Sequence, residues 1–246
     1  MARQDPAESG EDVGREVGGV LAAATILALG VGNRLADLEK GAGTGAIASW
    51  HLDILQNLAG ELAMSIVRLQ IAGPESWHVV TPLAHAARYA LELRIWAEYC
   101  CRSEANARRF FEDRWLDGRD FHKAIENFAM TVGGPAASEK LAPLYDRLAR
   151  TLDRTQRACG AEGDRRAFTR VSAAAEGVGL GPFFADANRV LSKFAHPTSM
   201  VVLGFTPDAS KLTGFFRAVG GECCWLGLTA IGDHADALLR GAPLSP

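Results

Sequence analysis

The sequence lacks the short motifs that mark the common metal, phosphate and acyl-transfer sites. Its 246 residues contain no Cys-x-x-Cys pair, no His-Glu-x-x-His run, no glycine-rich loop closed by Lys-Ser or Lys-Thr, and no Gly-x-Ser-x-Gly turn. Those patterns place ligands around zinc, backbone amides around phosphate groups, or a serine nucleophile on a strained turn. We therefore expect no metal site, no cofactor and no serine-hydrolase chemistry.

An excess of charge of either sign is also missing. The chain carries 26 Lys and Arg residues against 29 Asp and Glu residues, which gives a formal net charge of −3 at pH 7. This balance gives no global attraction to nucleic acid or to anionic lipid, although it is compatible with a local basic face.

Cysteines in disulfide-like spacing are scarce as well. The five cysteines form two adjacent doublets and a singleton: Cys100, Cys101, Cys159, Cys223 and Cys224. An odd number in this arrangement is typical of reduced thiols in a cytoplasmic protein. Because both doublets fall inside apolar helical patterns, we expect buried thiols and a cytoplasmic location.

Alternation of apolar and polar residues with period two, the pattern of a half-buried strand, does not occur over any useful length. Apolar residues instead recur at three-to-four spacing, which predicts an all-α fold. We expect a single-domain bundle of long antiparallel helices with shorter central helices, spanning 14–240 between flexible tails at 1–13 and 241–246. The expected helices are 14–40, 46–71, 77–102, two short ones within 103–131 broken near Asp117–Gly118, 138–159, one ending near 175, 183–196, and 209–240.

The first expected helix contains the most apolar segment of the chain, Val17 to Val31. About 15 residues fall short of the roughly 20 that cross a bilayer, so we expect a core helix and no membrane span. Its glycines also suit close packing against another helix, which allows a homodimer through helical faces.

The most informative stretch runs from Asn188 to Ser199. Arg189, Ser192 and His196 are spaced i, i+3 and i+7, so a helix places all three on one face. Pro197 disfavours continuation of that helix, which puts His196 at or near a helix terminus.

A second polar stripe lies on the expected helix 77–102. It comprises His85, Arg88, Glu92, Trp96 and Tyr99, beside an apolar stripe formed by Val80, Ala84, Ala87, Leu91 and Ile95. Apolar flanks predict that the polar stripe is buried, and buried charges need partners. Arg88 and Glu92 are four residues apart and can pair with each other.

Two interpretations of this pair remain open. In the first interpretation, the Arg88–Glu92 pair only stabilises the packing of the core. Together with Arg189, Ser192 and His196, and with Tyr99 nearby, it forms a cluster that positions an anion and moves a proton.

Two basic stretches have simpler interpretations. One is Arg102, Arg108, Arg109, Arg114 and Arg119, interleaved with aromatic residues and with five acidic ones. The other is Arg147, Arg150, Arg154 and Arg157, with Asp146 and Asp153 beside them. Both predict the solvated, salt-bridged face of a helix.

Two resemblances add to this picture. Arg88-x-x-x-Glu92 on a long helix, followed by Ser192-Lys193-x-x-His196-Pro197, resembles a set of uncharacterised bacterial helical proteins with a Ser-Lys-x-x-His-Pro signature. The similarity covers roughly 45–205 and implies the fold and the site location, but no reaction.

The second resemblance is to HEPN domains, helical modules that often cleave RNA through an Arg-x(4 to 6)-His motif. Arg189 and His196 enclose six residues, the long limit of that motif. This resemblance implies a metal-independent ribonuclease in which His196 is the acid or base and Arg189 stabilises the phosphate. The chain departs from the pattern at Val190, where a polar residue is usual, and at Pro197.

The function predicted from the sequence is therefore a cytoplasmic bacterial helical protein whose Arg88, Glu92, Ser192 and His196 cluster binds a phosphate-bearing ligand or acts on RNA. The alternative is a non-enzymatic interaction module in which the cluster only fixes helix packing. If Arg189 and His196 line an open cleft, catalysis is favoured. If both are sealed and paired, the structural role is favoured.

Overall fold

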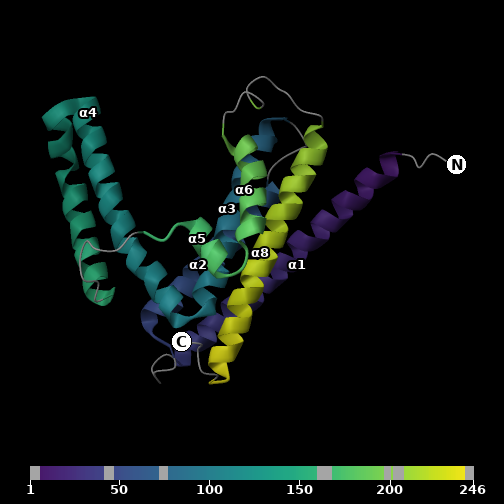
Figure 1. The fold of residues 1–246 in the computed structure, drawn as a ribbon, viewed down its shortest axis with the longest axis horizontal. Coiled ribbons are helices and arrows are strands. Elements are labelled where there is room, and N and C mark those ends of the chain that lie inside the picture. Colours follow the sequence, from purple (N-terminus) through teal and green to yellow (C-terminus); the bar gives the residue numbers. More distant parts are fainter. Residues whose placement is uncertain are drawn as a thin grey trace. The chain divides into compact units, whose positions relative to one another are not determined.

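The computed structural model describes residues 6–41, 47–71, 77–159, 168–196, 201 and 208–241 (Figure 1). Its helices are α1 Pro6–Gly41, α2 Ser49–Ile71, α3 Trp77–Arg102, α4 Glu104–Cys159, α5 Val171–Gly177, α6 Gly181–Ala195 and α8 Ala209–Leu239. These described parts contain no strand, and the all-α prediction is confirmed. Helix α1 begins earlier than predicted, and 1–5 and 242–246 of the predicted tails lie outside the described residues.

Contacts between α-carbons divide the chain into two compact units. The first contains Met1–Glu104 and Val171–Pro246, and the second contains Ala105–Arg170. Nothing in the apolar pattern indicated this division. Each unit is described by itself below.

In the first unit, α1 and α2 run antiparallel, as their short connection predicted. Gln70 donates a hydrogen bond to Thr25, and Gln56 donates one to Glu39. Helix α2 runs antiparallel to α3 in the same way, since Tyr89 donates to Glu61. The long C-terminal helix α8 instead runs in the same direction as α1 and α3 (Figure 1).

Glycines on α8 allow this helix to approach its neighbours closely. A Cβ atom at Gly220 would lie 2.8 Å from Leu69 Cδ1 and 3.1 Å from Ala87 Cα. A Cβ atom at Gly227, seven residues further on, would lie 3.0 Å from Leu62 and 3.3 Å from the Arg94 Cα. The seven-residue step is the same on all three helices, which is the repeat of long helices packed side by side.

The core side chains of α2 and α3 are those that the helical period predicted. All five residues of the apolar stripe predicted on α3 are buried, and α2 buries a stripe of the same three-to-four spacing, Ile54, Leu55, Leu58, Leu62, Ile66 and Leu69. The largest fully buried side chains include Leu55, Leu62, Ile66, Leu69, Leu83, Leu91, Ile95, Phe216, Leu228 and Ile231.

Both cysteine doublets, Cys100–Cys101 and Cys223–Cys224, consist of free thiols. Cys100, Cys223 and Cys224 are buried and Cys101 is half-buried, so the expectation of buried thiols is confirmed for three of them. Burial raises the pKa of Cys224 to about 12 and that of Cys223 to about 11. These thiols are therefore protonated at neutral pH.

Helix α1 is longer than its apolar segment suggested. From Val17 to Gly41 it has 25 residues, and its most apolar 18-residue window has a mean hydropathy of 1.5, so this helix is long and apolar enough to cross a membrane by length and composition. Core helices of water-soluble proteins and signal sequences pass the same test. In the described part of the chain, α1 packs against α2 and α8, and 22% of its most apolar window is buried.

The second unit is a helical hairpin built from α4. The break predicted near Asp117–Gly118 is wrong, because the helix continues through both residues. The chain turns instead at Gly134, with φ 63° and ψ −161°, a conformation that favours glycine. Pro135 follows at the first turn of the second arm, where its missing N–H costs nothing. The centre of the chain thus forms two long arms in place of the shorter helices expected.

Candidate functional site

Helices α3 and α6 bring the two polar motifs together. The Arg94 guanidinium lies 4.9 Å from the ring centroid of Phe183 near the start of α6, and Arg88 reaches His196 at its end. The two helices therefore run antiparallel. Helix α6 ends where the sequence predicted: Ala195 is its last residue, and His196 has an extended backbone with φ −111° and ψ 155°.

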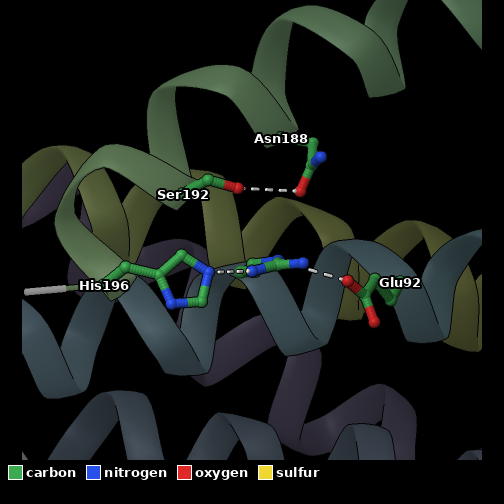
Figure 2. Close-up of polar contacts among 5 residues, drawn as sticks. Glu92, Asn188, Ser192 and His196 are labelled. Carbon is green, nitrogen blue, oxygen red and sulfur yellow. Dashed lines mark hydrogen bonds and ion pairs between the residues drawn. The ribbon is translucent and has the colours of Figure 1, made fainter.

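Arg88 is the centre of the site and contacts both Glu92 and His196, which are labelled in Figure 2. Its Nε donates to Glu92 Oε1 at 3.2 Å, which is the predicted pair within α3. Its Nη1 lies 2.9 Å from Nε2 of His196. A guanidinium has only N–H donors, so Nε2 is the acceptor in this contact, which assigns the ring proton to Nδ1.

The site is more open than predicted. The side chains of Arg88 and Glu92 are 29% and 31% exposed, and His196 is exposed. The prediction of a buried cluster is therefore wrong. Arg88, Glu92 and His196 lie at the edge of the packing between α3 and α6. There the charged groups keep part of their hydration and avoid the large cost of full burial.

Ser192 does not join the Arg88 contact. Its hydroxyl donates to Asn188 Oδ1 at 3.2 Å, one turn back on α6, and Figure 2 shows this bond apart from the one at His196. The bond lies within one helix and does not link the two motifs.

Two further predicted residues lie elsewhere. Tyr99 is buried, meets Trp96 edge-on with ring centroids 5.8 Å apart, and lies beside Gly177 of α5. Seven residues separate it from Glu92, about 10 Å along the helix axis. Arg189 is exposed, and no hydrogen bond or ion pair joins it to another described residue. The structure therefore brings together Arg88, Glu92 and His196 of the six predicted residues.

Sequence reasoning gave no role to His85. Its ring lies edge-on to that of His196, with the ring centroids 6.2 Å apart and an interplanar angle of 85°, and His85 is exposed. The available signal was its position three residues before Arg88, one turn back on the same stripe. We call His85, Arg88, Glu92 and His196 the Arg88–His196 patch.

The patch can hold an anion. The patch contains one guanidinium, two imidazoles and one carboxylate. Of the Arg88 nitrogens, only Nε and Nη1 form hydrogen bonds to other described residues. The remaining N–H groups on Nη2 match the geometry of a phosphate or carboxylate.

A second pair of histidines is deeply buried in the same unit. His51 on α2 and His234 on α8 have ring centroids 5.3 Å apart, and Nε2 of each is buried without a hydrogen-bond partner among the described residues. Burial and, to a smaller extent, the nearby His234 lower the pKa of His51 to about 4. Burial also lowers the pKa of His234, while a hydrogen bond to the Cys101 backbone opposes that shift. Among the described residues, no three potential ligands group into a metal site.

No family model, no curated protein and no solved structure matches the chain. The two resemblances drawn from the motifs therefore stay predictions, and the function must be argued from the geometry of the site.

Proposed function

We propose that the Arg88–His196 patch binds a phosphate-bearing ligand. The observation that carries this proposal is the 2.9 Å contact between Arg88 Nη1 and His196 Nε2, which joins two helices at a half-exposed position. It fixes a guanidinium at the surface while leaving other N–H donors directed to a ligand. Arginine in this setting favours planar oxyanions, because two parallel N–H groups match two oxygens.

The charges around the patch support an anionic ligand. Arg189 and Lys193 are exposed on α6, the helix that His196 follows, and Glu92 is the acidic member of the patch. An incoming phosphate also offers Arg88 a more highly charged partner than the neutral imidazole. Binding would therefore move Arg88 from His196 to the ligand and release the Nε2 lone pair.

Cleavage of RNA is a second candidate, favoured by the ring contact between His85 and His196. A neutral His196 takes the proton of a ribose 2′-hydroxyl, and that oxygen attacks phosphorus. The bond from phosphorus to the 5′ oxygen breaks, and a protonated His85 supplies the proton to that leaving oxygen. The products are a 2′,3′-cyclic phosphate and a 5′-hydroxyl, formed without oxidant or metal.

Calorimetric titration with inorganic pyrophosphate tests the binding proposal. Losing charge-assisted hydrogen bonds from Arg88 should weaken binding by about ten-fold or more in Arg88→Ala. Arg68→Ala is the matched control, since Arg68 is also half-exposed and paired with a carboxylate of its own unit, at Glu61. Equal binding by both variants, or no binding by the unmodified chain, would contradict the proposal.

The structural alternative gives a different result in the same experiment. If the patch only holds α3 against α6, Arg88→Ala lowers the free energy of unfolding and no phosphate compound binds the unmodified chain.

The cleavage candidate is tested separately by incubating a short RNA with the variants His85→Gln and His196→Gln. Each variant should lose the cyclic phosphate product while retaining pyrophosphate binding that depends on Arg88.

A further inference from the structure

The second arm of α4 carries a stripe of four arginines, Arg147, Arg150, Arg154 and Arg157. Their spacing of i, i+3, i+7 and i+10 places all four on one face of the helix. All four are exposed. The stripe spans ten residues, about 15 Å along the axis.

The opposite face of this arm packs within the hairpin. Tyr145 meets His122 of the first arm edge-on, with ring centroids 5.1 Å apart, and Leu141 and Leu148 are half-buried. By the helical period, these positions lie on the side away from the arginines. The stripe therefore faces outward from the hairpin.

The nearby carboxylates do not neutralise the stripe. Asp146 and Asp153 are exposed, but no ion pair joins either of them to the four arginines in the described part of the chain. Arg154 Nε donates to the Arg150 carbonyl, and Arg157 Nε donates to the Asp153 carbonyl, each at 3.2 Å. These bonds hold two guanidiniums against the helix. The solvated face expected from the sequence is confirmed, whereas the expected salt bridges are absent among the described residues.

We propose that this arginine stripe binds the phosphate backbone of a nucleic acid. Every basic residue of the stripe is arginine, whose planar fork suits phosphate oxygens better than the point charge of lysine does. Successive arginines lie about 4.5 to 6 Å apart along the axis, so the four guanidiniums form a continuous row that can follow the phosphates of one strand. Local positive charge of this kind acts despite a net charge of −3.

The composition of the stripe favours nucleic acid over a lipid surface. Helices that lie in a membrane interface combine basic residues with large apolar side chains on the buried face. Here the apolar side chains Leu141, Tyr145 and Leu148 are turned toward the other arm of the hairpin. Between the arginines, the outer-face positions Thr151 and Asp153 are polar, and Leu144 is the one large apolar side chain exposed in the described part of this arm, too little to anchor the stripe in lipid.

Anisotropy of a fluorescein-labelled RNA of mixed sequence, titrated with the full chain at several salt concentrations, tests the proposal. Four phosphate contacts to a single strand predict a slope of log K against log salt of about −3. The variant Arg150→Gln with Arg154→Gln should reduce the slope to about −1.5 and weaken binding at low salt about ten-fold.

The control removes the same charge elsewhere, in Lys211→Gln with Arg240→Gln on α8, where both residues are exposed. It should leave the slope and the affinity unchanged. An equal loss in the control, absence of RNA binding at low salt, or tighter binding to phosphatidylserine vesicles or polyglutamate than to RNA would overturn the proposal. Pyrophosphate binding at the Arg88–His196 patch should be unchanged in Arg150→Gln with Arg154→Gln, so the two proposals are tested independently.

Discussion

Lowering the pH from about 7 toward 4 should destabilise the folded chain through His51. The side chain is 1% exposed and its pKa is lowered from 6.5 to about 4, mainly by burial. Between these two values the unfolded chain binds a proton at this position and the folded chain does not. The contribution of His51 to the free energy of unfolding therefore falls as the pH drops through that window, and it is constant above the window. A pKa difference of this size lowers the free energy of unfolding by about 3 kcal/mol at the acidic end of the window.

Urea denaturation at about pH 7, 5.5 and 4.5 measures this effect. Carboxylates titrate in part of the same range, so the comparison is between variants. His51→Leu fills a similar volume, removes the unpartnered Nε2 atom, and should flatten the pH dependence by about 3 kcal/mol. His78→Gln changes an exposed histidine on α3 and should keep the full dependence. Parallel profiles for His51→Leu and the unmodified chain would refute the reasoning.

Two further outcomes follow from the packing of α8. Gly220→Ala should lower the free energy of unfolding by about 1 to 3 kcal/mol, because its Cβ would lie 2.8 Å from Leu69. Gly60→Ala, with open space around it, should be neutral or should raise that free energy by up to about 1 kcal/mol. Thermal denaturation distinguishes them, and equal losses would contradict the packing. Cys224, with a pKa of about 12, should resist alkylation by iodoacetamide in the native chain and react on unfolding, as mass spectrometry of the labelled peptide would show.

The helical period predicted the long elements and their buried faces because each apolar stripe has one packing partner. It could not predict that α8 runs parallel to α3, since the same stripe suits either direction. That choice depends on Gly220 and Gly227 meeting the backbone at Ala87 and Arg94, a match between residues far apart in the sequence. The turn at Gly134 lies between the expected helices that end by 131 and begin at 138, where a glycine followed by proline favours a break. Gly118 was placed wrongly, since one glycine inside a helix costs only about 1 kcal/mol.

The candidate site divides in the same way. Spacing within one helix predicted the Arg88–Glu92 pair, and the proline after His196 predicted that this residue ends its helix. Contact between helices depends on their offset along the axis, which no spacing in one helix contains. That offset brings His85 to His196 and leaves Tyr99 next to α5.

The central claim is that Arg88 holds His196 as an acceptor and that phosphate competes for Arg88. Long-range nitrogen–proton NMR spectra of the histidine rings test it most directly. At a pH where the ring is neutral, His196 should carry its proton on Nδ1, because Nε2 accepts from Arg88. Adding pyrophosphate should shift the Nε2 signal of His196 and leave that of the exposed His78 unchanged. A proton on Nε2 of His196, or the same response to pyrophosphate in both rings, would contradict the claim.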